Sequence, residues 1–121
     1  DTYILPPMAN ALSLSWGLDL AGPALDADHP VAGQFTSLTE LLDLAGRRHI
    51  DLPADGNLAV PGYEPVTGVV VQHLEDGIED GHEVFFQLPA PKRQYRCFLE
   101  GLRTSTPTVS IGDSSPCPSG D

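Results

Sequence analysis

The sequence predicts an α+β domain in which two or more helices pack against an antiparallel sheet of about four strands, followed by a C-terminal loop bounded by a disulfide bond. Three observations support this prediction. Residues 37–46 have the signature of a capped helix, residues 66–88 contain two strand-like runs around a turn, and the only two cysteines enclose a short C-terminal segment. A chain of 121 residues that is 40% hydrophobic fits one compact domain, residues 1–121, in which residues 104–121 are the disulfide-tethered end.

The charge balance argues against two kinds of partner. The chain has 17 acidic and 6 basic residues, a formal net charge of −11. Because this charge repels phosphate groups, we expect neither strong nucleic-acid binding nor attraction to anionic lipid.

The N-terminal region fits two kinds of element. Leucines or tryptophan alternate with small or polar residues from Leu12 to Leu20, and this period favours a strand over Ala11–Leu20. A helix from Met8 to Ala21 is the alternative, since leucine and alanine are good helix formers. We expect Trp16 to belong to the core.

An irregular loop is expected from Gly22 to Gln34. It contains Asp26, Asp28 and His29, residue types that bind metals. Because no further ligand follows at a suitable spacing, we expect a solvated loop and no metal site.

The best-marked helix begins at Ser37. Ser37 and Glu40 have the spacing of a capping box, and Gly46 is a natural helix stop. The apolar stripe expected to be buried consists of Leu38, Leu41, Leu42 and Ala45.

Two strands are expected after a proline- and glycine-rich loop over His49–Pro65. Val66–Leu74 is rich in β-branched residues and is interpreted as a central strand, and Glu83–Leu88 alternates as a half-buried strand does. Two Asp-Gly pairs between them predict a hairpin connection.

The C-terminal region is expected to form a helix, a short strand and a fastened tail. Apolar residues at helical spacing predict a buried stripe of Tyr95, Phe98, Leu99 and Leu102. Cys97 points away from that stripe, so a bond to Cys117 would hold the tail over the helix's outer surface, with a strand at Pro107–Ile111 between the cysteines. A disulfide here implies an oxidising location, hence export.

Charged residues form two groups that could be solvated faces or contacts between copies of the chain. The acidic group is Glu75, Asp76, Glu79, Asp80 and Glu83, and the basic group is Lys92, Arg93, Arg96 and Arg103. In the second interpretation the acidic loop of one copy meets the basic helix of the next, a contact that propagates.

Motifs of the common enzyme classes are absent from the sequence. It contains no Gly-x-Ser-x-Gly elbow, phosphate-binding glycine loop, His-Glu-x-x-His or Cys-x-x-Cys. His73 and His82 are the remaining catalytic candidates, and each is more simply a packed or exposed histidine. We therefore expect no catalytic residues, no cofactor and no enzymatic activity.

Several short motifs resemble type IV pilins of the IVb kind. They are Phe35–Leu42 with Ala45-Gly46 and Leu52-Pro53, then Gly68–Val71, then Val84–Phe86, and then Leu88-Pro89, Cys97, Val109–Gly112 and Cys117. The resemblance implies a pilin or minor pilin, the soluble domain of a structural subunit in a bacterial type IV pilus or related surface filament, serving adhesion, motility or transfer of DNA or protein. It implies export to the cell surface or periplasm. The expected partners are other copies or sibling pilins, with membrane contact only through a removed N-terminal helix.

A second hypothesis follows if Leu12–Leu20 is a strand. The element order then becomes β-α-β-β-α-β, the ferredoxin-like arrangement. This order would suit a stand-alone periplasmic or secreted binding, assembly or inhibitor domain. A helix over Ala11–Leu20 favours the pilin hypothesis, and a strand favours this one.

Overall fold

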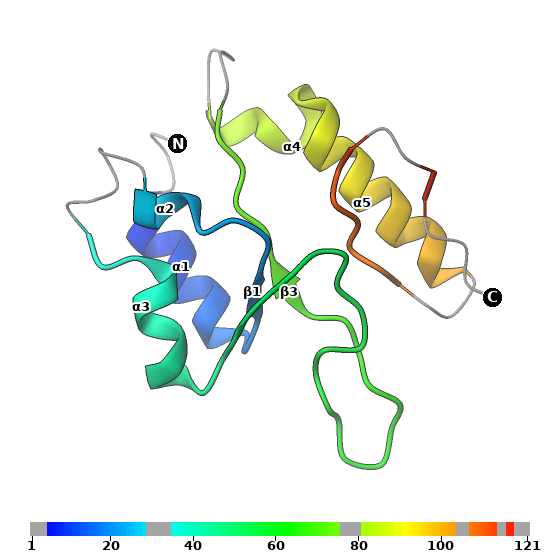
Figure 1. The fold of residues 1–121 in the computed structure, drawn as a ribbon, viewed down its shortest axis with the longest axis horizontal. Helices are drawn as coiled ribbons and strands as arrows, with labels where there is room; N and C mark the ends of the chain where they lie inside the picture. Colours follow the sequence, from blue (N-terminus) through cyan, green and yellow to red (C-terminus); the bar gives the residue numbers. More distant parts are fainter. Residues whose placement is uncertain (1–4, 29–34, 76–80, 104–106, 114–115, 118–121) are drawn as a thin grey trace.

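A computed structural model describes residues 5–28, 35–75, 81–103, 107–113 and 116–117 (Figure 1). Within them the α-helices are α1 (Pro6–Ser15), α2 (Leu25–Asp28), α3 (Leu38–Leu42), α4 (Val84–Gln87) and α5 (Pro89–Leu102). The strands are β1 (Asp19–Ala21), β2 (His49–Ile50) and β3 (Val69–Val70), and the 3-10 helices are η2 (Asp43–Ala45) and η3 (Gly81–Glu83).

The sheet is parallel, so the prediction of an antiparallel sheet of about four strands is wrong. Its three strands have the order β2-β1-β3, and β1 pairs in parallel with both neighbours. Leu20 lies opposite His49 on one side and Val70 on the other. The reason lies in the connections: α2 and α3 bring the chain back to the starting end of β1 before β2 begins, and such a crossover makes neighbouring strands parallel.

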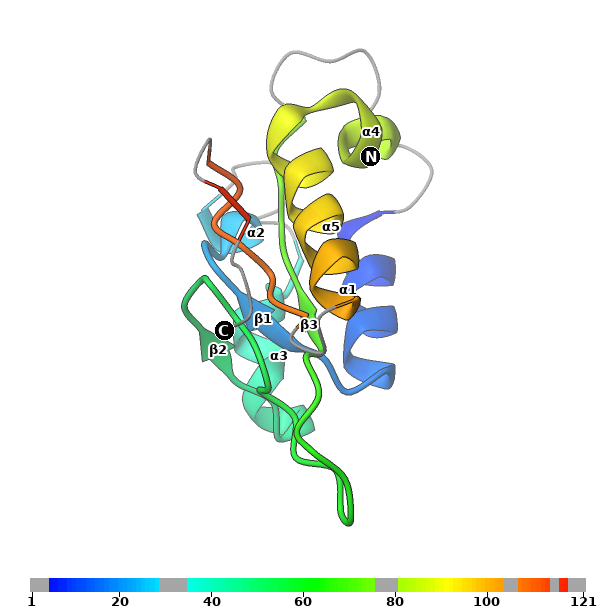
Figure 2. The same ribbon diagram turned by 90° about the vertical axis from the view of Figure 1, so that its right-hand side faces the viewer.

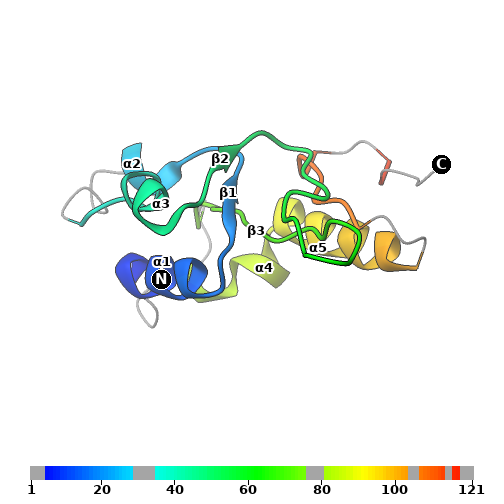
Figure 3. The ribbon, with the colours of Figure 1, turned by 90° about the horizontal axis from the view of Figure 1, so that it is seen from below.

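Three layers result. Figures 2 and 3 show α1 and α3 on one face of the sheet and α5 with the C-terminal segment on the other. The buried core on the α3 side consists of Leu20, Leu38 and Leu42, with Leu14 of α1 and Val70 of β3 packed against it. Both faces of the sheet are therefore covered at least in part, as is usual for parallel strands.

The strand predicted over Ala11–Leu20 is a helix for most of its length. Pro6 and Pro7 occupy the first turn of α1, where proline is well tolerated because these N–H groups have no helical partner. Gly17, with φ +70°, follows the helix, and only Asp19–Ala21 is strand. Trp16 is 69% exposed, so its assignment to the core is also wrong.

The capped helix is confirmed at its start and its end. Ser37 Oγ accepts from Glu40 N, and Glu40 Oε2 accepts from Ser37 N, which completes the capping box. Gly46 adopts the left-handed conformation at the end of η2. Leu38 and Leu42 are buried and Leu41 is half-buried, whereas Ala45 is exposed because the last turn is the 3-10 helix η2.

The two strands predicted after residue 65 are mostly absent. Val66–Leu74 contributes only Val69–Val70, at the edge of the sheet rather than its centre. Glu83–Gln87 is helical, with η3 running into α4, and Leu88 is extended. A short apolar run such as Val84–Phe86 fits either period, and here it is part of α4, which leads into α5 with Pro89 in its first turn. The ferredoxin-like element order is therefore wrong as well.

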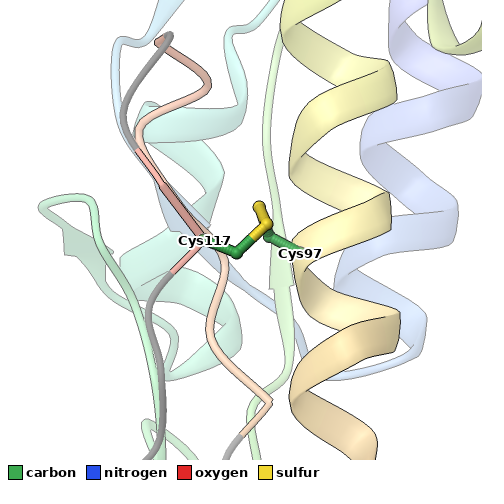
Figure 4. The surroundings of a disulfide bond; sticks show 2 residues. All are labelled: Cys97 and Cys117. Atoms are coloured by element: carbon green, nitrogen blue, oxygen red, sulfur yellow. A yellow bond between two sulfur atoms is a disulfide. The ribbon is translucent and has the colours of Figure 1, made fainter.

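The helix predicted near Tyr95 exists but buries the opposite side. In α5 the buried residues are Pro91, Gln94, Cys97 and Gly101, whereas Tyr95, Leu99 and Leu102 are 47%, 54% and 54% exposed. The predicted disulfide is confirmed between Cys97 and Cys117, with a Cα–Cα distance of 5.1 Å (Figure 4). It lies between α5 and the C-terminal segment, so the tail covers the buried side of the helix.

Two further expectations concern irregular segments. Pro107–Ile111 was expected to be a strand, but it forms only one isolated antiparallel bridge, between Val109 and Ala54. The expected loop over His49–Pro65 begins with β2 and also contains a bridge between Leu58 and Val66. The C-terminal segment is thus attached to the loop that follows β2 as well as to α5.

Candidate binding groove

Two cavities lie on the α5 side of the sheet. The larger, about 710 Å³, is formed by β3, α5 and the segment between α1 and β1, and the smaller, about 400 Å³, by residues after β1 and the start of α5. Four residues line both cavities: Val71, His73, Pro91 and Gln94. The continuation of β3 and the buried side of α5 therefore form a common wall.

The larger cavity, which we call the aromatic groove, has a mostly apolar lining. Its walls include Trp16, Phe85, Tyr95 and Phe98, and its floor includes Val69 and Val71. The remaining lining residues are Leu18, Thr67, Gly68, His73, Pro91, Gln94 and Val109. None of the thirteen residues is Asp, Glu, Lys or Arg. A cavity of this size with apolar and aromatic walls and few polar groups has the usual character of a binding site.

Exposed apolar side chains lie on or just after three helices, and of these Trp16, Phe85 and Tyr95 line the groove. On α1 and just after it, Met8, Leu12 and Trp16 are exposed at four-residue spacing, and on α5 Tyr95, Leu99 and Leu102 are about half exposed. On α4, Phe85 and Phe86 contact each other edge to face, with ring centroids 4.7 Å apart. Figure 3 shows α1, α4 and α5 grouped near the edge of the sheet that β3 forms, with β2 at the opposite edge. One apolar face of each helix is thus left for solvent or a partner.

A hydrogen-bonded chain fixes the polar part of the common wall. Gln94 Nε2 donates to the carbonyl oxygen of Ser110 at 2.7 Å, and Gln94 Oε1 lies 2.7 Å from His73 Nε2. Gln94 and Ser110 are buried, and His73 is half-buried. The arrangement connects the end of β3, α5 and the C-terminal segment through one side chain.

The buried carboxylates lie elsewhere and have structural partners. Asp19 accepts hydrogen bonds from Asn57 Nδ2 at 2.8 Å and from the backbone N of Arg48 at 2.9 Å, and it pairs with the Arg48 guanidinium at 3.1 Å. Burial raises the pKa of Asp19, but these contacts outweigh it and hold the pKa below its ordinary value. Neither Asp19 nor Asp26 lines the aromatic groove.

Asp26 connects the elements of the opposite layer. Its Oδ2 accepts from Leu38 N at 2.7 Å and from Asn10 Nδ2 at 3.0 Å, and its backbone N donates to Gln72. Burial raises the pKa of Asp26, and hydrogen bonds from Leu38, Gln72 and Asn10 lower it further than burial raises it. Asp28 is exposed in α2, and His29 lies outside the described residues. Within the described ranges no three His, Cys, Asp or Glu side chains gather as a metal site.

The structure describes only some of the residues that were predicted as subunit contacts. Lys92 and Arg96 are exposed on α5, Glu75 is exposed after β3, and Arg93 is half-buried. Within the part of the chain that the structure describes, two guanidinium nitrogens of Arg93, Nε and Nη2, are buried without a hydrogen-bond partner. Asp76, Glu79 and Asp80 lie outside the described residues, so whether the acidic and basic groups meet across copies stays a prediction. Of the two catalytic candidates, His82 is exposed in η3 and His73 lies in the common wall.

Sequence reasoning missed Gln94 and assigned Trp16 to the wrong environment. One signal could have found Gln94. It precedes Cys97 by three residues, so it shares a helix face with the cysteine and must face the tail that the disulfide fastens.

Comparison with known proteins identifies no relative. Models of protein families, curated protein sequences and solved structures give no significant match to the chain. Among the helices of the described residues, none has the length and apolar character needed to cross a membrane.

Proposed function

We propose that this chain is a non-enzymatic binding subunit that engages a partner protein through the aromatic groove, outside the reducing environment of the cytoplasm. The observation that supports this most directly is the exposure of large apolar side chains around the groove. Single exposed apolar residues are common, but contiguous apolar surface rimmed by polar residues marks an interaction site. Here Trp16 just after α1, Phe85 of α4 and Tyr95 of α5 are exposed and line the groove.

The disulfide supports the compartment. A bond between Cys97 and Cys117 is typical of oxidising extracellular or periplasmic environments. Export to such an environment is part of the proposal. The bond also fixes α5 from its buried side, which leaves the apolar side of that helix available for contact.

Site-specific photocrosslinking tests the docking surface. A photoreactive amino acid at Tyr95, which lines the groove, should give one discrete crosslinked product in the source cells. The matched control is the same amino acid at Leu44, which is 85% exposed on η2 and does not line the groove. Equal products from both positions, or none from Tyr95, would contradict the proposal.

A pilus or related filament subunit is the finer form of this function. The observation that favours it is helix α1, because a helix over Ala11–Leu20 was expected for a pilin-type subunit and α1 covers Ala11–Ser15 of that range. The partner would then be another copy or a sibling pilin. Lys92 and Arg96 are exposed and suit a charged contact with an acidic surface.

Two measurements test the filament form. Changing Lys92 and Arg96 together to Glu should weaken self-association in a salt-sensitive way, measured by sedimentation velocity, and Arg47→Glu is a basic-residue control outside α5. Unchanged association would show that these residues are not part of the contact.

The coding DNA upstream of Asp1 should also encode a basic leader and an apolar stretch with a glutamate near its start, and a simple cleavable signal peptide there would contradict a pilin.

A further inference from the structure

We infer that the aromatic groove recognises a tryptophan or tyrosine side chain of the partner protein, whose N–H or O–H group donates a hydrogen bond to Nδ1 of His73. The inference rests on the proposed function and specifies the chemistry of the partner. It follows from three features of the groove: a histidine with a fixed tautomer, aromatic walls, and a basic rim.

The tautomer of His73 follows from its hydrogen-bonded chain. The carbonyl oxygen of Ser110 can only accept, so the side-chain nitrogen of Gln94 must face it and the side-chain oxygen must face His73. That oxygen can also only accept, so Nε2 of His73 carries the hydrogen. In the neutral imidazole Nδ1 is then an acceptor. Nε2 is the ring nitrogen that bonds Gln94, so Nδ1 is the nitrogen left to accept a hydrogen bond from a ligand.

The walls suit a flat, uncharged ring. Trp16, Phe85, Tyr95 and Phe98 offer ring faces and edges, which favour stacked or edge-to-face packing with another aromatic ring. The lining has no carboxylate or cationic side chain of Asp, Glu, Lys or Arg, so a charged group entering it would lose hydration without compensation. Phenylalanine would fill the space but leave Nδ1 without a donor, whereas tryptophan and tyrosine supply one.

The rim adds charge complementarity. Lys92 and Arg96 lie three residues before and one residue after Tyr95, on the exposed side of α5. Exposed Glu100 follows one turn after Arg96, so the basic edge is the turn from Lys92 to Arg96, and in a chain of net charge −11 it favours an acidic residue next to the aromatic anchor in the partner. The proposed ligand is therefore a polypeptide segment with tryptophan or tyrosine beside aspartate or glutamate.

The first experiment measures the tautomer without any ligand. The ¹⁵N shifts of the His73 imidazole, recorded on the whole chain at a pH where histidine is uncharged, should show Nε2 protonated and Nδ1 bare. Gln94→Leu should shift the tautomer balance. A wild-type imidazole protonated at Nδ1 would overturn the inference, and it would leave the crosslinking result from Tyr95 as the separate test of docking.

The second experiment measures the donor with matched probes. N-acetyl-aspartyl-tryptophanamide and its 1-methyltryptophan analogue differ in the indole N–H, and binding is followed by the methyl resonances of Val69 and Val71. One unshared hydrogen bond predicts about three- to tenfold weaker binding of the methylated probe. His73→Phe should remove this difference, and replacing aspartate with lysine in the probe should weaken binding. Equal affinities for the two probes in wild type, or no shift of Val69 and Val71 with either, would overturn the inference, whereas the docking function falls only if Tyr95 also gives no crosslink.

Discussion

Helices α3 and α5 have the same kind of apolar stripe, but the stripe is buried in α3 and about half exposed in α5. In α3, Leu38 and Leu42 are 1% and 2% exposed against Leu20 of the sheet. In α5, Tyr95 and Leu99 are about half exposed although their spacing is equally regular. An amphipathic pattern thus shows that a helix has an apolar side, but not that its own chain covers that side.

The two helices are also attached to the sheet by different means. Helix α3 is held by apolar packing and by the Asp26 carboxylate at its N-terminus. Helix α5 is held through its small and polar side, by the disulfide at Cys97 and the hydrogen bonds of Gln94. A helix fastened in this way keeps its apolar side available for another molecule, and this difference motivates four predictions.

The largest expected effect separates the two stripes directly. Leu42→Asp should unfold the domain, with a loss of about 4 kcal/mol or more, because it places a charge in the core beside Leu20. Leu99→Asp, the matched change on α5, should alter the free energy of unfolding by no more than about 0.5 kcal/mol. Urea denaturation measures both, and similar losses in the two variants would refute the comparison.

Reducing the disulfide should affect mainly the α5 side. Closing a loop of 20 residues stabilises a fold by about 3 kcal/mol in the chain-entropy description. After reduction we expect amide hydrogen exchange to accelerate in α5 and the C-terminal segment, while β1 and α3 stay protected. Alkylation should modify both cysteines only after reduction. Uniform acceleration over α3 and α5 would indicate one cooperative unit.

Removing the carboxylate of Asp26 should act on the α3 side in a pH-dependent way. Asp26→Ala leaves Leu38 N and Asn10 Nδ2 without their acceptor and should cost about 2 kcal/mol at neutral pH. The pKa of Asp26 is lower in the fold than its ordinary value of 3.8, so its contribution is complete well above pH 3.8 and is lost as pH falls through the folded pKa.

Thermal melting between neutral and acidic pH measures this. The difference in stability between wild type and Asp26→Ala should shrink below pH 3.8. Asp28→Ala in the same helix is the control, because Asp28 is exposed. A difference that stays constant over the whole pH range would show that ionisation of Asp26 does not contribute.

The smallest expected effect concerns the start of each helix. Ser37→Ala removes the capping-box acceptor of α3 and should cost about 1 kcal/mol. Helix α5 begins at Leu88 and Pro89 with no side-chain cap, so Pro89→Ala should change stability little. Equal losses in both variants, measured by thermal unfolding, would contradict the assignment of the cap.

The features that the sequence predicts correctly are local. The capping box depends on Ser37 and Glu40, which are three residues apart, and the stop depends on the backbone freedom of Gly46. The disulfide could be predicted because Cys97 and Cys117 are the only cysteines. For these features the interacting residues are identified by short spacing or by elimination.

The errors arise where distant packing decides. Leucines from Leu12 to Leu20 satisfy helix and strand periods alike, and the prolines at residues 6 and 7 decide for α1. Strand direction depends on the crossover through α2 and α3, which short motifs do not record. The aromatic groove combines Trp16, Phe85 and Tyr95 from three distant segments, and no motif joins them.

The loop between β2 and β3 offers a place to modify the protein. Its base is fixed by Asn57, which bonds Asp19 and both backbone groups of Gly68, and by the bridge between Leu58 and Val66. Beyond this base the tip projects from the body, with Tyr63 80% exposed (Figure 1). An epitope tag or fluorophore inserted near Gly62 should therefore be tolerated, because the hydrogen bonds at the base stay intact. Labelled protein could then be used in binding measurements without a label on α1, α4 or α5.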